Sequence, residues 1–178
     1  MEKETIKELL TKFYIEYHNG KYKEAIQLLN DILLKEDGDD FWIYSRLSSC
    51  YYELRDYEKA LFYAKKAYKL NPESPLVLWD YAGVLIMLKK ENKAIELLKR
   101  IQNMSDDLTN QGFMDPDIKW MQSLKNDANF LIGKAYYIIC EDAKAKDFLS
   151  NYLSNQDKGM KSIYAKEEAL LYLNKIDA

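Results

Sequence analysis

The stretch Phe41–Ser74 decides the fold, and it reads FWIYSRLSSCYYELRDYEKALFYAKKAYKLNPES. Large apolar and small residues recur in it at helical spacing, in two blocks that a short polar turn separates. Two amphipathic helices joined by so few residues form an antiparallel hairpin. The dipeptide Asn71-Pro72 then interrupts the chain, because the residue before a proline disfavours the helical conformation. The stretch therefore predicts one helical hairpin with a defined end.

The hairpin pattern returns elsewhere in the chain. A shift of 34 residues carries Tyr44–Tyr51 onto Leu78–Leu85 and carries Ala60 onto Ala94. A later copy contains Ala145, which lies 51 residues after Ala94, or one period plus an insertion of 17. We therefore expect a repeat array. Its four hairpins are predicted at about 7–40, 41–74, 75–108 and 126–159, with the insertion at about 105–125.

This pattern resembles that of the tetratricopeptide repeat family. The family has large residues at positions 4, 7 and 11 of its repeat, a small residue at 8, alanine at 20 and 27, and proline at 32. The stretch Phe41–Ser74 fits through Tyr44, Leu47, Ser48, Tyr51, Ala60, Ala67 and Pro72. The first copy departs from the pattern because Tyr14 occupies the small position, and the last has Asn129 at position 4. The resemblance covers about three quarters of the chain and implies an all-α, right-handed superhelical solenoid of antiparallel helix pairs.

Two segments outside the repeat pattern are also predicted to be helical. Between Pro116 and Ile139 only Gly133 weakens helix formation, so we expect one extended helix of roughly 24 residues after a loop over Ser105–Met114. Apolar residues at helical spacing predict a further amphipathic helix over about 162–176. Such a terminal helix caps the open end of a solenoid. We expect a single domain over 1–178.

Short polar residues mark the predicted helix starts. Ser74, Asp56 and Asp115 each stand just before a helical block, where a side-chain oxygen can accept a hydrogen bond from the first turn. The acidic run 36–40 lacks the ligand order of an EF-hand loop. We interpret it as a solvated turn that supplies the next N-cap.

Composition excludes several classes of protein. Apolar residues make up 48% of the 178 residues and charged residues 31%, so the chain can bury a core and is not disordered throughout. The 26 Lys and Arg residues against 29 Asp and Glu residues give a net charge of −3, which argues against a general nucleic-acid-binding protein. No stretch reaches the ~18 apolar residues of a membrane span, and no apolar leader precedes the first helix. We therefore expect a cytoplasmic protein that does not enter membranes.

Residues that could carry catalysis are scarce. His18 is the only histidine and is expected on the surface or at the wall of a groove. Cys50 and Cys140 have neither a nearby histidine nor Cys-x-x-Cys spacing, and we interpret both as buried free thiols in a reducing compartment. No glycine-rich phosphate loop occurs. We expect no enzymatic activity, no cofactor and no bound metal.

The resemblance also implies a binding surface. In this family, positions 2, 5, 9 and 12 of the first helix of each repeat line a concave groove. Carried over to this sequence, they give Ser45, Ser49, Tyr52, Leu76, Trp79, Gly83, Ile86, Phe130, Lys134 and Tyr137. Arg46 is expected to help orient a bound segment. In the competing interpretation, the insertion fills the groove with its own apolar side chains, which include Phe113, Met114, Trp120 and Met121.

These features favour a non-catalytic protein–protein interaction module that binds a peptide or a helix of a partner in its groove. A dedicated chaperone or neutralising partner of one secreted or toxic client is the first alternative. An RNA-binding helical-repeat protein is the second, and the acidic balance argues against it. One subclass of the family binds acidic C-terminal peptides with a Lys and Asn clamp, which is missing here because Asp80 and Asp127 stand at two of its places. The partner could also be a second copy of the chain.

Overall fold

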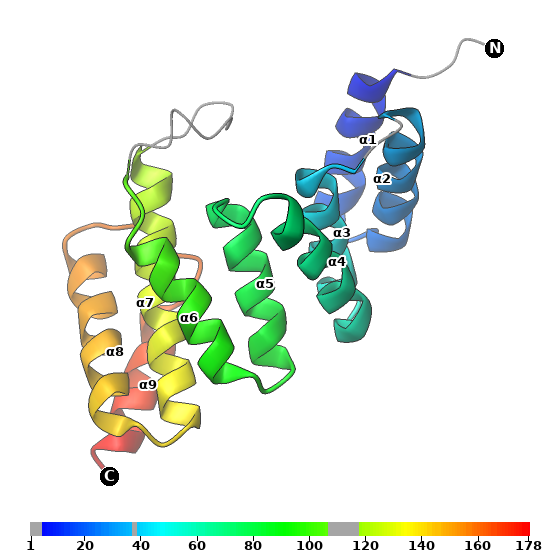
Figure 1. Cartoon of the computed structure of the whole chain (residues 1–178). Coiled ribbons are helices and arrows are strands. Elements are labelled where there is room, and N and C mark those ends of the chain that lie inside the picture. Colours follow the sequence, from blue (N-terminus) through cyan, green and yellow to red (C-terminus); the bar gives the residue numbers. More distant parts are fainter. Residues whose placement is uncertain (1–4, 37–38, 107–117) are drawn as a thin grey trace. The chain divides into compact units, whose positions relative to one another are not determined.

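The computed structural model describes residues 5–36, 39–106 and 118–178. Within these ranges all regular secondary structure is α-helical, as the repeat pattern predicts (Figure 1). The helices are α1 (Ile6–His18), α2 (Tyr22–Glu36), α3 (Phe41–Glu53), α4 (Tyr57–Leu70), α5 (Pro75–Met87), α6 (Glu91–Gln102), α7 (Ile118–Ile138), α8 (Asp142–Asp157) and α9 (Lys166–Ile176).

The chain divides into two compact units. The first, Met1–Leu88, contains α1 to α5, and the second, Lys89–Ala178, contains α6 to α9. The boundary falls inside the third predicted repeat, 75–108. The single domain over 1–178 and its right-handed superhelical path therefore stay predictions, and each unit is described by itself.

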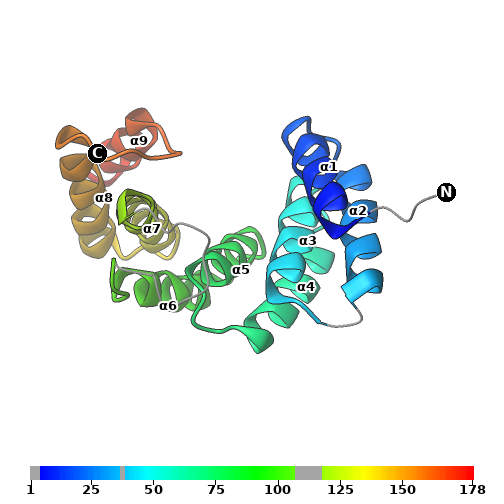
Figure 2. The same ribbon diagram turned by 90° about the horizontal axis from the view of Figure 1, so that it is seen from above.

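The first unit consists of two antiparallel hairpins and one further helix. Helices α1 and α2 lie side by side and run in opposite directions, as do α3 and α4, and α5 packs against both α3 and α4 (Figures 1 and 2). Ala25 and Ala60 are fully buried where the helices of each hairpin meet. The hydroxyl of Ser48, at the small position of its repeat, donates a 2.9 Å hydrogen bond to the carbonyl of Ala60. The predicted packing positions of these residues are confirmed.

One cation–π contact repeats with the sequence period. The ammonium group of Lys59 lies 5.2 Å from the ring centroid of Tyr51, and that of Lys144 lies 5.3 Å from the ring centroid of Tyr136. The two pairs are separated by two repeats plus the insertion, as the alignment of the repeats requires. The last hairpin is therefore in the predicted register.

The predicted helix caps are confirmed where the structure describes them. Asp56 and Ser74 each accept a hydrogen bond from the backbone N–H three residues further on, at 3.2 and 3.5 Å. Asp40, at the end of the acidic run, does the same at 2.8 Å. Asp115 lies outside the described residues.

The turn that follows the first helix of each predicted repeat contains one residue with a left-handed backbone. The φ angle is 73° at Gly20, 60° at Arg55, 55° at Lys89 and 60° at Cys140. Glycine adopts this conformation freely, whereas a β-carbon makes it cost about 1–2 kcal/mol. Three of the four turns therefore keep this geometry without glycine, so the helices on either side must impose it.

In the second unit, α7 confirms the extended helix that the sequence predicts. It runs without a break from Ile118 to Ile138, and the predicted start at Pro116 lies outside the described residues. Helices α6 and α8 pack against α7, and α9 packs against α7 and α8. A β-carbon at Gly133 of α7 would lie 2.7 Å from Cγ of Leu149 in α8. Gly133 is thus the small residue that this crossing requires.

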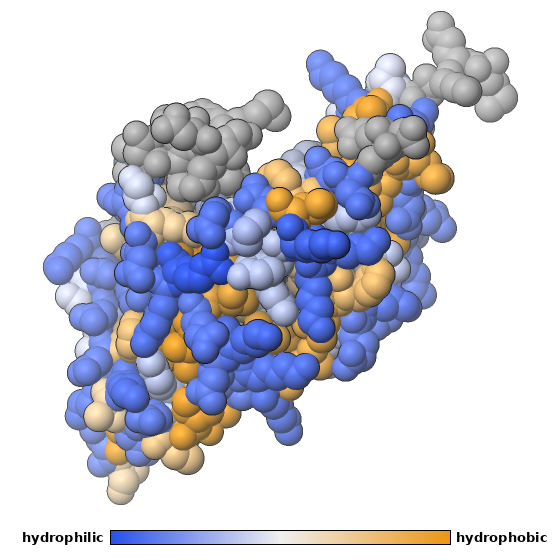
Figure 3. Space-filling view, viewed as in Figure 1, coloured by the Kyte–Doolittle hydropathy of each residue, from blue (hydrophilic) through white to orange (hydrophobic). Residues whose placement is uncertain are grey.

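Two expectations need correction. The terminal helix begins at Lys166 rather than near Ser162, so Ile163, which falls within the predicted range 162–176, precedes the helix and is exposed. Cys140 is an exposed free thiol rather than a buried one, because it lies in the left-handed turn after α7. Cys50 is a buried free thiol, as expected. Figure 3 shows hydrophilic residues covering much of the visible face of each unit, with hydrophobic residues between them.

Candidate functional site

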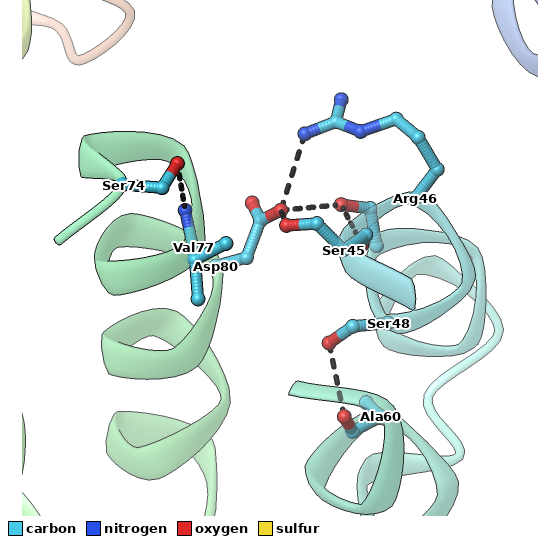
Figure 4. A network of polar contacts seen from close by, with 8 residues as sticks. Ser45, Arg46, Ser48, Ala60, Ser74, Val77 and Asp80 are labelled. Atoms are coloured by element: carbon cyan, nitrogen blue, oxygen red, sulfur yellow. Dashed lines mark hydrogen bonds and ion pairs between the residues drawn. The ribbon is translucent and has the colours of Figure 1, made fainter. Parts of the chain in front are cut away.

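Four polar side chains of α3 and α5 form a connected cluster in the first unit (Figure 4). The Oδ2 atom of Asp80 accepts hydrogen bonds from the hydroxyls of Ser45, at 2.5 Å, and Ser49, at 3.2 Å. The same oxygen lies 3.1 Å from Nη2 of Arg46. Arg46 and Asp80 are 34 residues apart, so they occupy equivalent positions in successive repeats. The cluster therefore joins two neighbouring repeats.

Asp80 is a largely buried carboxyl group. Its side chain is 14% exposed. Burial raises its pKa above the ordinary 3.8, while the charge of Arg46 and the hydrogen bonds from the two serines act in the opposite direction. Three donors on one oxygen thus do not fully replace the lost hydration.

Arg46 is only partly accessible, with a side chain that is 18% exposed. Its Nε is buried and has no hydrogen-bond partner among the described residues. The guanidinium charge of Arg46 lowers the pKa of Tyr17 in α1 and of Cys50 in α3, but burial outweighs it and raises the pKa of each to about 12. Both groups are therefore protonated and uncharged at neutral pH, so neither competes with Asp80 for the charge of Arg46.

Apolar side chains of α5 continue this surface. Leu76, Trp79, Gly83 and Ile86 follow one another at spacings of three and four residues, and all are half-buried. A β-carbon at Gly83 would meet no atom within 4 Å, so there is open space one helical turn from Trp79. On α3, Tyr52 is half-buried and packs edge-on against Tyr57, with ring centroids 5.7 Å apart.

We call this region the α3–α5 surface. It is built from Ser45, Arg46, Ser49, Tyr52, Leu76, Trp79, Asp80, Gly83 and Ile86, of which Ser45 is fully buried rather than exposed in the groove as expected. Eight of these residues belong to the predicted groove, and Asp80 is the addition. Asp80 was missed because it lies beside the groove positions that the family pattern names. The sequence contains one indication of this role, because Asp80 lies one repeat period after Arg46, a residue of opposite charge.

Phe130 does not lie on a surface. It is 0% exposed, and its ring stacks on that of Tyr164 with centroids 4.5 Å apart. The expectation that Phe130 lines an open groove is corrected, because a molecule approaching this part of the second unit meets Tyr164 first. Lys134 and Tyr137, the other predicted residues of α7, are half-buried and both lie against the ring of Tyr172 in α9.

A polar network holds the segment that covers Phe130. The hydroxyl of Ser162 donates to Asp127 at 2.5 Å, and the hydroxyl of Tyr152 donates to the carbonyl of Tyr164 at 2.6 Å. We call Asp127, Tyr152, Ser162 and Tyr164 the C-terminal clasp. It fastens the connection between α8 and α9 to α7 and α8, and this brings the ring of Tyr164 onto Phe130.

The structure describes the insertion at its two ends. Its helical end belongs to α7, where Met121 is fully buried and Trp120 is exposed. Lys125 fixes the residues that follow α6, since its ammonium group lies 2.6 Å from both the carbonyl of Met104 and a carboxylate oxygen of Asp106. Phe113 and Met114 lie outside the described residues. The idea that the insertion fills the groove stays a prediction.

Some further features bear on chemistry. Among the described residues, no group of three or more His, Cys, Asp or Glu side chains is placed to hold a metal ion. No helix in the described ranges is long and apolar enough to cross a lipid bilayer. His18 is exposed at the end of α1. The α3–α5 surface itself offers aromatic and aliphatic area beside a charge pair.

Successive hairpins of two antiparallel helices, in a register that repeats every 34 residues, define a helical-repeat protein. The tetratricopeptide repeat family matches this chain twice, over residues 16–62 and 51–107. Together the two matches include α2 to α6 and more than half of the chain. The chain belongs to the tetratricopeptide repeat family.

Solved structures share the fold. A crystal structure of MamA has a TM-score of 0.65 and 17% sequence identity, over 96% of this chain and 89% of that one. A thermophilic TPR protein of Thermus thermophilus, TTC0263, has a TM-score of 0.65 and 16% identity, over 97% and 81%. The apo form of RapI has a TM-score of 0.75 and 18% identity, over 97% and 62%. At these identities the likeness concerns the fold alone. No curated protein sequence matches the chain.

Proposed function

We propose that the chain is a non-catalytic protein-interaction module that binds a peptide or a helix of a partner protein on the α3–α5 surface. The observation that carries this proposal is the open space at Gly83, one turn from the half-buried ring of Trp79. Aromatic side chains beside such space serve as anchors that dominate binding energy. Leu76 and Ile86 extend the apolar area along α5, as an amphipathic partner helix requires.

The polar cluster determines which side of this surface can hydrogen-bond a partner. Ser45 and Ser49 are bonded to Asp80, so their hydroxyls hold the repeats together rather than reach toward a partner. Arg46 is the charged member of the cluster that stays partly accessible, since its side chain is 18% exposed. A backbone carbonyl or a carboxylate of the partner would meet Arg46 while its apolar side chains meet Trp79. The partner segment therefore carries an apolar anchor with an acceptor near it.

The proposal is tested by two substitutions that act on the same space in opposite ways. Trp79→Ala removes the anchor, and Gly83→Leu fills the space with a side chain of the chain itself. With a partner captured from the source organism and then purified, calorimetry should show each variant binding at least roughly tenfold more weakly. The free energy of unfolding of Gly83→Leu should not fall below that of the wild type, because no atom stands within 4 Å of the new β-carbon and leucine favours helix over glycine.

The matched control is Leu34→Ala on α2, which truncates an apolar side chain that is exposed and outside the α3–α5 surface. Its affinity should equal that of the wild type. Unchanged affinity in both Trp79→Ala and Gly83→Leu would refute the proposed site. A large loss of stability in Trp79→Ala with unchanged affinity would assign Trp79 to the core instead.

A further inference from the structure

Helix α4 has a basic and apolar outer face. It contains four lysines and one glutamate, in a chain whose net charge is −3. Phe62 is 54% exposed and Leu70 is 44% exposed, and the exposed Lys65 and Lys66 lie between them in sequence. Residues 62, 66 and 70 follow one another at intervals of four, so an apolar, a basic and an apolar side chain form one row along the helix.

The cations of this face are not neutralised within the described chain. Among the described residues, Lys65 and Lys66 form no ion pair with a carboxylate. The ammonium group of Lys66 lies 4.7 Å from the ring centroid of Tyr44 and 5.2 Å from that of Phe62, and it donates a 3.4 Å hydrogen bond to the Tyr44 hydroxyl. The charge of Lys66 is therefore held above an exposed aromatic ring, where a carboxylate from another molecule could reach it.

Helix α9 and the residues just before it have the opposite arrangement. Ile163 is 74% exposed and Leu171 is 53% exposed, and the exposed Glu167 stands midway between them in sequence. Glu168 beside it is exposed too. Neither glutamate forms an ion pair within the described residues. Glu167 and Leu171 lie one turn apart on α9, whereas Ile163 precedes the helix, which begins at Lys166.

We propose that the outer face of α4 in one molecule docks antiparallel onto α9 of a second copy of this chain. In that arrangement Phe62 meets Leu171 and Lys66 meets Glu167, while Lys65 meets Glu168 in the adjacent row. On each helix the charged and the apolar residue lie one turn apart, and the charges of the two helices are opposite, which is the complementarity that fixes the register of an interface. Both faces are exposed in the described structure, so no rearrangement of the helices is needed.

This contact joins two different faces, so it is heterologous. In a dimer of this kind one molecule keeps a free α9 face and the other a free α4 face, so further copies can add until the rotation closes a ring. One helix pair is a small interface, so the association is weak and depends on protein concentration. The docking uses the second helix of a hairpin and the terminal helix, so it leaves the α3–α5 surface open.

Sedimentation velocity over a roughly hundredfold range of protein concentration tests the proposal. The wild type should grow from monomer to dimer and larger species, and added salt should weaken this association. The double variant Lys65→Glu/Lys66→Glu and the double variant Glu167→Lys/Glu168→Lys should each associate at least roughly tenfold more weakly. An equimolar mixture of the two double variants should associate like the wild type, because each then offers the charge that the other needs.

The control is Lys23→Glu/Lys93→Glu, which makes the same change in net charge at exposed lysines of α2 and α6. It should associate like the wild type. A wild type that stays monomeric at every concentration overturns the proposal, as does association that persists in both charge-reversed variants. Failure of the mixture to recover association also overturns it. Trp79→Ala should leave association unchanged, which separates this contact from partner binding.

Discussion

Arg46 and Asp80 hold the same position in successive repeats, and their side chains meet at 3.1 Å. The repeat period therefore places a cation of α3 beside an anion of α5, although the two residues are far apart in the sequence. Ser45 and Ser49, one on each side of Arg46 along α3, complete the set of donors. One buried carboxyl group thus connects two repeats.

The stability of this connection should depend on pH. Burial raises the pKa of Asp80, so the folded chain keeps that proton to a higher pH than the unfolded chain does. The contribution of Asp80 to stability is then greatest below its ordinary value of 3.8 and falls as the pH rises through the raised pKa. Asparagine does not ionise. The free energy of unfolding of the wild type, relative to Asp80→Asn, should therefore decline as the pH increases over this range.

Urea denaturation at a series of pH values measures this difference. Asp31→Asn, at an exposed position of α2, is the control, and its difference from the wild type should show no comparable decline. A wild type that gains stability relative to Asp80→Asn as the pH rises would show that Arg46 and the serines outweigh burial.

Two glycines of first helices should respond to the same substitution with opposite sign. Gly83→Ala adds a β-carbon to open space, and alanine favours helix by about 0.8–1 kcal/mol over glycine, so stability should rise. Gly133→Ala places its β-carbon 2.7 Å from Cγ and 3.2 Å from the backbone nitrogen of Leu149, so stability should fall by ~1–3 kcal/mol. Denaturation midpoints of the two variants give the comparison. Equal effects would contradict the described crossing of α7 and α8.

The left-handed turns should respond to glycine. Arg55 has a φ of 60°, which a β-carbon disfavours by about 1–2 kcal/mol. Arg55→Gly should therefore be more stable than Arg55→Ala by about 1 kcal/mol, since only the glycine variant relieves the conformation. In a helix interior the order of the two variants would be reversed. The companion change Gly20→Ala, at a φ of 73°, should destabilise the first hairpin.

The two thiols should differ in reactivity. Cys140 is exposed in a turn, whereas Cys50 is buried and burial raises its pKa to about 12. A disulfide reagent at neutral pH should therefore modify one thiol of the native protein quickly and the second only on unfolding, because the thiolate is the reacting form. Cys140→Ser should remove the fast phase and leave the slow one. Two fast phases in the wild type would contradict the burial of Cys50.

The sequence predicted those parts of the fold that repeat. Ser48 and Ala60 meet because the repeat period determines where the helices cross. For the same reason the rings of Tyr51 and Tyr136 each contact a lysine at the equivalent position of their repeat. Seven of the α3–α5 residues followed from family positions and Arg46 from its place beside them, while their binding role stays a prediction. Asp80 is equivalent to Arg46, and only the contact between the two reveals its role.

The burial of Phe130 could not be predicted in this way. Its position in the repeat is one that faces a groove, and the ring that covers it, Tyr164, lies outside the repeat pattern. The hydrogen bond between Ser162 and Asp127 joins two segments, only one of which belongs to the repeat pattern. The repeat period predicts contacts between repeats, and it carries no information about a segment that occurs only once.

The C-terminal clasp has a consequence for the order in which the molecule forms. During synthesis α7 and α8 leave the ribosome before Ser162 and Tyr164 do, and domains fold from the N-terminal side as they emerge. The first unit can complete its core early. In the second unit, Phe130 stays uncovered until the segment that shields it has emerged. The nascent chain therefore exposes an aromatic surface from the moment α7 emerges until Tyr164 follows it.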